Sequence, residues 1–213
     1  ADDTIESFGR NTNLTHVSMR QLVLTEDFTL INNGGGVNLG ADVFAPGRNI
    51  TVEAGTIDVL AGVTVSTHAT GSDAGDISLI ASGNSPRVAF AADSKVLAHS
   101  SHPGLFHPGD ITIRAEMSRT IWALFYRGGA AEATITVDSA TLKGGAITLE
   151  SFTDAGSPPE LTAPSDNGWL NIPNSVLGYL TSLSPIAGVA ISTATSIINV
   201  QGLSVISGTE VAL

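Results

Sequence analysis

Apolar and polar residues alternate with a period of two along most of this chain, which is the pattern of half-buried β-strands. The alternating runs are short and are bounded by Gly, Asn, Asp or Ser. No sustained helical period precedes residue 165. The pattern therefore predicts an all-β fold for most of the chain.

One strand motif recurs four times, with glycine followed by isoleucine, a hydroxyl residue and a second aliphatic residue. Its copies begin at Gly47, Gly75, Gly109 and Gly145. Their isoleucines lie 27, 34 and 36 residues apart, which predicts constant strands joined by loops of variable length. A second motif alternates with the first, at 37–44, 57–65, 135–142 and 198–205, with a weaker copy at 88–96.

Equivalent strands that recur only after 27 or more residues, with a different strand between them, favour stacking over hairpins. We therefore expect a parallel β-helix, a solenoid whose inward Ile, Val and Leu residues form a continuous core. A β-sandwich or barrel is the alternative, since it also uses short alternating strands.

Three segments break the repeat. Residues 117–126 are rich in large apolar side chains, residues 152–195 form an insertion with five prolines, and the region before Leu22 matches no repeat. Within the insertion, residues 174–183 could form a short helix. We expect a single domain over 1–213. Because the chain begins at Ala1 and ends in a strand-like run, we also expect a piece of a longer repeat protein.

The motif copies at 47–54, 55–65 and 74–79 resemble the repeats of filamentous haemagglutinin-like exoproteins, which are large bacterial adhesins. The resemblance covers roughly residues 35–150 and 196–213. It implies a right-handed parallel β-helix and an extracellular or cell-surface location. It also implies binding to cells, surface proteins or matrix polysaccharide.

Composition narrows the range of partners. The net charge is −11, with 9 Lys and Arg against 20 Asp and Glu, so the chain is poorly suited to bind nucleic acid or an anionic membrane. There is no cysteine, which excludes disulfides and thiolate metal sites. No run of about 20 apolar residues is present, so no membrane insertion is expected.

Two polar groups are candidates for metal binding. His99, His102, His107 and Asp110 lie in one Gly- and Pro-rich loop and could bind Zn²⁺, although their spacing matches no standard site. Asp73, Asp76 and the pair Asp2 and Asp3 could contribute oxygen ligands to Ca²⁺. In both cases a solvated loop or turn is the favoured explanation, and no metal-binding residue is assigned. No cofactor is required, and Ca²⁺ is the alternative.

Three further features could have a function. Asp76 and Asp110 precede motif isoleucines and could lie on adjacent layers, as a carboxylate pair in a polysaccharide-active enzyme would. The residues after those isoleucines, Thr51, Ser78, Thr112 and Thr148, should form an outward column, which ice-binding proteins use in pairs. An aromatic patch could bind sugars or proteins, although the favoured explanation is that the insertion folds back and covers the coil. Its members would be Trp122, Phe125, Tyr126, Trp169, Leu170, Tyr179 and Leu180.

These observations favour an extracellular adhesin or matrix scaffold that presents recognition loops, rather than an enzyme. The expected partners are extracellular polysaccharide or a surface protein, and self-association is possible in principle. A polysaccharide lyase or hydrolase is the first alternative. A self-assembling structural fibre subunit is the second.

Overall fold

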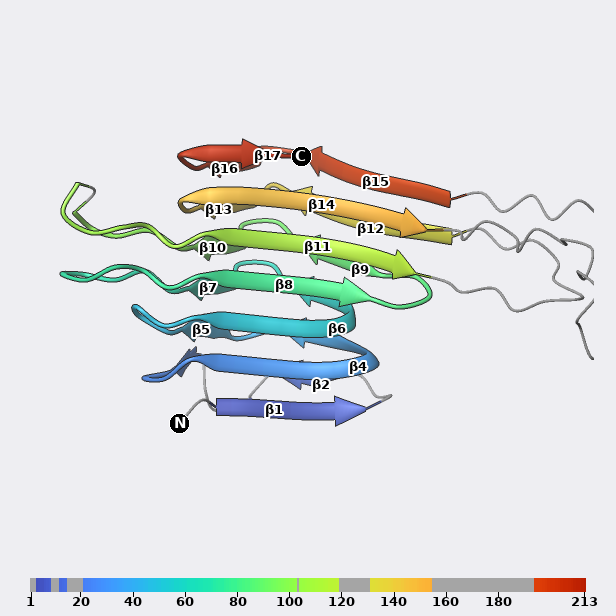
Figure 1. The fold of residues 1–213 in the computed structure, drawn as a ribbon, viewed down its shortest axis with the longest axis horizontal. Helices are drawn as coiled ribbons and strands as arrows, with labels where there is room; N and C mark the ends of the chain where they lie inside the picture. The colour runs from blue at the N-terminus through green and yellow to red at the C-terminus, as the bar shows by residue number, and fades with distance from the viewer. Residues whose placement is uncertain (1–2, 9–11, 15–20, 103, 119–130, 155–193) are drawn as a thin grey trace, which may run out of the picture.

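The protein is described by a computed structural model over residues 3–8, 12–14, 21–102, 104–118, 131–154 and 194–213. These residues form seventeen β-strands and no helix (Figure 1). The expected all-β class is confirmed for this part of the chain. No helix among the described residues is long and apolar enough to cross a membrane.

The strands fall into three groups by the face to which they belong. The first face contains β1 (Asp3–Phe8), β8 (Ile77–Ser82), β11 (Ile111–Ser118), β14 (Ala146–Asp154) and β17 (Glu210–Ala212). The second contains β2 (Thr12–Leu14), β9 (Arg87–Phe90), β12 (Ala131–Asp138) and β15 (Ala194–Gln201). The third contains β3 (Gln21–Val23), β5 (Asp42–Phe44), β7 (Thr64–Ser66), β10 (Lys95–Leu97), β13 (Thr141–Lys143) and β16 (Val205–Ser207). Two long strands, β4 (Phe28–Leu39) and β6 (Ile50–Val59), run through both the first and the second face.

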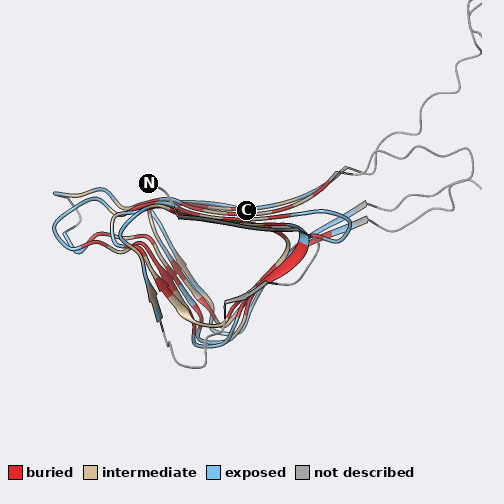
Figure 2. Ribbon diagram, turned by 90° about the horizontal axis from the view of Figure 1, so that it is seen from below, coloured by how far each residue is buried: buried red, intermediate tan, exposed pale blue. Residues whose placement is uncertain are grey.

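All of the strand pairs are parallel, and they build two sheets. The larger sheet has eleven strands, with the order β15-β12-β9-β6-β8-β11-β14-β17, and β4 joins β1 and β2 to β6. The smaller sheet has six strands, in the order β16-β13-β10-β7-β5-β3. Seen along the stack, the two sheets enclose a triangular cross-section (Figure 2).

The register of the first face matches the sequence repeat. Ile50 pairs with Ile77, Ile77 with Ile111, and Ile111 with Ile147. Motif copies that are 27, 34 and 36 residues apart therefore lie directly on one another, and loops absorb the difference in length. The prediction of constant strands with variable loops is confirmed.

The predicted right-handed parallel β-helix is wrong as a description of this architecture. In β6, residues 50–54 pair with β8 and residues 56–59 pair with β9, so one unbroken strand turns the corner between two faces. At the bend, a Cβ on Gly55 would lie 2.9 Å from the carbonyl oxygen of Gly35, so only glycine allows the two backbones to approach. The first and second faces consequently form one sheet, curled like half a barrel, beside a separate second sheet.

The core lies between the two sheets and consists of inward columns of aliphatic side chains. The middle column of the first face is formed by Leu30, Val52, Leu79, Ile113 and Leu149, each at most 1% exposed. Burial alternates with exposure along each strand, as the period-two pattern requires. Hydrophobic burial of these columns is the main stabilising term of the fold.

Several predicted features lie outside the described residues. They include most of the 152–195 insertion, its possible helix at 174–183, and the aromatic patch around Trp122 and Trp169. The strands that flank the insertion, β14 and β15, are described. They belong to the same curled sheet.

Candidate functional site

Two loops project beyond the strands at one corner of the triangle (Figure 2). One follows β7 and spans residues 67–76, and the other follows β10 and spans residues 98–110. They run side by side, because an isolated parallel bridge joins Ala69 to Ser100 and the Ala74 amide donates to the His107 carbonyl at 3.0 Å. We call them the projecting loops.

A pair of histidines lies at the base of the projecting loops. The rings of His68 and His99 stack with their centroids 4.2 Å apart and an interplanar angle of 26°. The Nδ1 of His68 lies 2.5 Å from the carbonyl oxygen of His99, and its Nε2 lies 3.1 Å from the Ser101 hydroxyl. Because a carbonyl can only accept, Nδ1 of His68 carries the hydrogen and Nε2 accepts from Ser101. We call His68 and His99 the histidine stack.

The environment of His99 disfavours its charged form. Burial lowers its pKa below the ordinary value of 6.5, and the neighbouring His68 and Lys143 lower it further. Its Nδ1 is buried and has no hydrogen-bond partner among the described residues. The unfolded chain binds the proton that charges His99 more tightly than the folded chain does. His99 therefore contributes stability that is present above pH 6.5. That contribution is lost as the pH falls from 6.5 through the lower folded pKa.

The other imidazoles of the predicted metal cluster point elsewhere. The Nδ1 of His107 lies 3.5 Å from Asp73 Oδ1, and both side chains are largely exposed. The same carboxylate oxygen accepts from the His107 amide at 2.7 Å. Within the described ranges, no group of three or more His, Asp or Glu side chains is placed to hold a metal ion. Asp2 and the side chain of Asp3 fall outside those ranges.

Asp76 and Asp110 do lie on adjacent layers, as predicted, but they bind backbone rather than each other's carboxylates. Asp76 Oδ1 accepts from the Asp110 amide at 2.8 Å, and Asp110 Oδ1 accepts from the Ala146 amide at 2.8 Å. The column continues in the other direction, where Asn49 Oδ1 accepts from the Asp76 amide at 2.8 Å and Asp27 Oδ1 accepts from the Asn49 amide at 2.7 Å. Each of these side chains thus links one layer to the next by a hydrogen bond to a backbone amide.

This column predicts a difference between two substitutions at Asp76. Asp76→Asn keeps an Oδ1 acceptor, as Asn49 already does one layer earlier, so we expect stability to stay within about 0.5 kcal/mol of the natural chain. Asp76→Ala removes the acceptor of the Asp110 amide and should cost about 1 kcal/mol. Urea unfolding of both variants measures the difference, and equal losses would show that the hydrogen bond contributes nothing.

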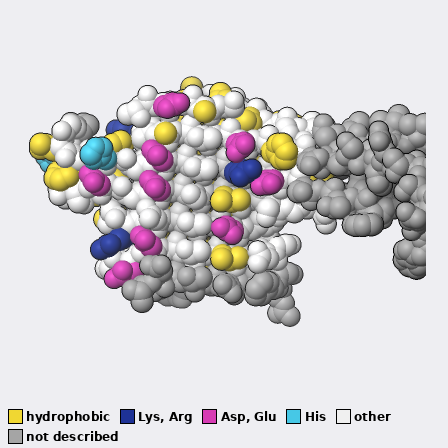
Figure 3. Space-filling model, in the orientation of Figure 1, with side chains coloured by type: hydrophobic (Ala, Val, Ile, Leu, Met, Phe, Trp, Pro, Cys, Tyr) yellow, Lys and Arg dark blue, Asp and Glu magenta, His cyan; other side chains and the backbone are white. Residues whose placement is uncertain are grey.

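The outer surface of the first face carries the predicted hydroxyl column. Thr51, Ser78, Thr112 and Thr148 lie in register, and the structure extends the column to Thr29. Beside it, Arg114 lies between two carboxylates, at 3.4 Å from both Glu116 and Glu150. Figure 3 shows a basic side chain flanked by acidic ones on this surface, and a column of acidic side chains near the projecting loops. The face is a single hydroxyl column among charges and aliphatic side chains, not a paired hydroxyl array.

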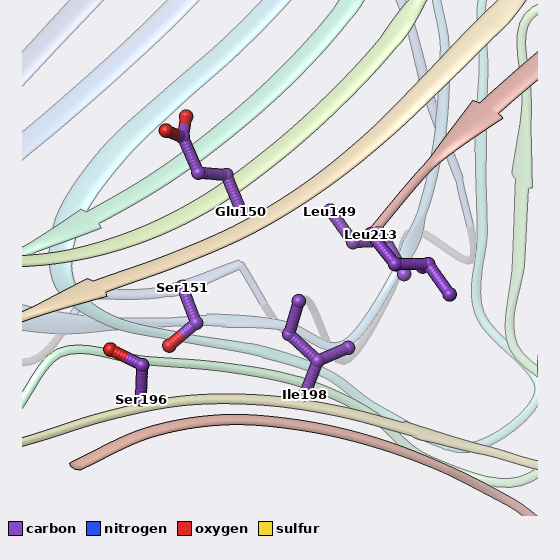
Figure 4. A pocket seen from close by; sticks show the side chains of 6 residues that line it. All are labelled: Leu149, Glu150, Ser151, Ser196, Ile198 and Leu213. Carbon is purple, nitrogen blue, oxygen red and sulfur yellow. The ribbon is translucent and has the colours of Figure 1, made fainter.

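Two shallow hollows are present on the described part. One, of about 410 Å³, opens between β14, β15 and the residue after β17, where Leu149, Ile198 and Leu213 face one another and Glu150 turns away (Figure 4). Ser151 and Ser196 complete its wall. The other, of about 350 Å³, is lined by the corner glycines and by the loop at 82–85. Neither collects titratable side chains in the way a catalytic cleft does.

Sequence reasoning missed His68 and Ser101. A signal was available, because His68 follows Val65 by three residues and His99 follows Val96 by three. Val65 and Val96 pair directly in the smaller sheet. The equal offsets place the two imidazoles on neighbouring layers. Comparisons with protein-family models, curated proteins and solved structures give no match for this chain.

Proposed function

We propose that the chain is part of an extracellular or cell-surface adhesin or matrix scaffold, in which stacked parallel strands hold recognition loops away from the body. The observation that carries the proposal is the pair of projecting loops at one corner (Figure 2). Binding residues commonly lie on loops that a rigid scaffold positions. The inward aliphatic columns and the interlayer bonds of Asp76 and Asp110 supply such a scaffold here.

The ends of the projecting loops offer groups suited to recognition. Leu105 is 77% exposed, and the side chains of His102 and His107 are also exposed. An apolar side chain among imidazoles can contact a protein surface or a sugar ring, and the imidazoles can exchange hydrogen bonds with hydroxyl groups. The repeats that resemble haemagglutinin-like exoproteins support the same assignment, with cells, a surface protein or polysaccharide as the partner.

Binding by labelled chain to bacterial cells and to an array of extracellular polysaccharides tests the proposal. A variant with His102→Ser, Leu105→Ser and His107→Ser should bind at least tenfold more weakly. The matched control carries Leu60→Ser, Lys95→Ser and Glu150→Ser, three exposed positions on the strand body and its turns. We expect the control to bind like the natural chain.

Two outcomes would overturn the proposal. One is equal binding by the loop variant and the control, which would place recognition elsewhere. The other is the release of new reducing ends or unsaturated sugars from a polysaccharide, which would favour the lyase or hydrolase. In that case, loss of product formation in Asp76→Asn would implicate the carboxylate column.

A further inference from the structure

The histidine stack is one of several direct links between the two projecting loops, and it lies at their base. At their base, the Thr67 amide donates to the Leu97 carbonyl at 2.9 Å and the Ser101 amide donates to the Ala69 carbonyl at 3.1 Å. The Ala69 amide reaches the His99 carbonyl only at 3.4 Å, which is a long hydrogen bond. Between residues 68–70 and 99–101, the stacked rings and their hydrogen bonds add to these backbone bonds and to a contact of 3.4 Å between the Thr70 and Ser101 hydroxyls.

A proton on Nε2 of His68 can be accommodated in the closed arrangement. When Nε2 of His68 is protonated, it can donate to the Ser101 hydroxyl, because a hydroxyl serves as donor or acceptor. The bond from Nδ1 of His68 to the His99 carbonyl is the same in both protonation states. Ring stacking between one charged and one neutral imidazole brings no like charges together.

The second proton cannot be accommodated in the same way. A proton on Nδ1 of His99 would be buried without an acceptor. Whichever ring nitrogen carries it, the charged ring would then face protonated His68, 4.2 Å away between centroids, and Lys143 on the next layer. Like charges at this distance repel, most strongly where burial reduces screening by water.

No carboxylate is placed to offset this repulsion among the described residues packed here. Asp73, in the 67–76 loop, is paired with His107 near the loop ends. The 45–48 turn contacts the first loop through the Gly47 amide and the Thr67 carbonyl, and its charged residue is Arg48, which is not an acid. On the other side, β13 contributes Lys143.

We propose that the histidine stack is an acid-sensitive contact, which holds residues 68–70 against 99–101 near neutral pH and separates them when both rings are protonated. The opening is local, because the Val65–Val96 pairing directly below lies in the fully buried core. The inference does not depend on the proposed function, since loop separation is measured without any ligand. Its consequence is that the base of the projecting loops loosens between neutral and mildly acidic surroundings, while the backbone bond from Ala74 to His107 nearer the loop ends is not part of the contact.

Hydrogen exchange followed by NMR tests the proposal at pH 7.5 and pH 4.5. We expect the protection factors of the Ala69 and Ser101 amides to fall at least tenfold at pH 4.5, while those of Val65 and Val96 are retained. Unchanged protection at Ala69 and Ser101 would overturn the proposal. Simultaneous loss at all four amides would also overturn it, because the chain would then unfold globally.

Three variants sharpen the test. His99→Phe keeps an aromatic ring to stack on His68 but cannot be protonated, so its loops should stay closed at pH 4.5. Lys143→Met removes one repelling cation and should reduce the acid-induced loss of protection. His107→Asn changes an exposed histidine outside the stack and should respond to acid like the natural chain.

A response of His99→Phe equal to that of the natural chain would overturn the proposal. If this variant fails to fold, the ring protons of His68 in the natural chain give a second measurement. Their chemical shifts should lose the ring-current contribution of His99 over the same pH range as the amides lose protection. Retention of that contribution at pH 4.5 would contradict the proposed separation.

Discussion

Replacing Gly109 by alanine is expected to destabilise the fold by about 3 kcal/mol or more, because there is no room for a methyl group at this corner. A Cβ at Gly109 would overlap the carbonyl group of Gly75 in the layer below. A Cβ at Gly75 would in turn overlap the backbone of Arg48. The clash is with backbone on both layers, so no side-chain rotation can relieve it.

Thermal and urea unfolding of Gly109→Ala measure this loss, and Gly71→Ala is its matched control. Gly71 has φ of +85°, so alanine is strained there, but its Cβ would meet no atom within 4 Å. The control should therefore cost only about 1–2 kcal/mol. Similar losses in the two variants would show that the stacked corner glycines are not held at the close approach described.

Replacing Ile113 by alanine should cost about 2–5 kcal/mol, because it removes a fully buried member of the middle column of the first face. Ile113 is fully buried between Leu79 in the layer below and Leu149 in the layer above. The cavity left behind cannot be filled without moving both neighbouring strands, which the register of the ladder opposes.

The neighbouring residue provides the control, since Thr112 lies on the same strand but on the outer surface. Thr112→Ala should change the free energy of unfolding by less than about 0.5 kcal/mol. Denaturant unfolding of the two variants tests the assignment of inner and outer columns. A larger loss in Thr112→Ala than in Ile113→Ala would reverse that assignment.

The period-two pattern was sufficient to predict parallel layers, their inner and outer residues, and the alignment of unequal repeats. These features follow from local alternation and from a core that accepts only aliphatic side chains. Thus Ile50, Ile77, Ile111 and Ile147 align in the structure as the motif predicts. The outward column from Thr51 to Thr148 follows from the same register.

The expected β-helix architecture was wrong because glycine has two structural roles in this sequence. A glycine between two alternating runs was interpreted as a break between separate strands. At Gly55 the chain instead bends while both halves of β6 remain paired, which joins two faces into one curled sheet. A glycine can end a strand or only bend it, depending on how closely another backbone approaches. The sequence of one strand does not show how close that approach is.

The candidate sites were harder to predict than the strands. The carboxylates of Asp76 and Asp110 were expected to lie close together, but their bonds to backbone amides depend on loop geometry. The histidines at 99, 102 and 107 are close in sequence, yet His99 stacks on a residue 31 positions earlier. Proximity in a stacked fold follows the layer period rather than distance along the chain.

The unequal separations of 27, 34 and 36 residues between hydrogen-bonded corner positions bear on how such a chain can change over evolutionary time. Because loop-closure entropy rises only with the logarithm of loop length, seven additional residues between two layers cost little. The same column of polar side chains bonds both a short layer and a long one to the next layer. The packing of the inner columns is therefore the same in both. Insertions in the loops between strands can thus accumulate independently in each layer, and the exterior can diversify while selection on the interior stays constant.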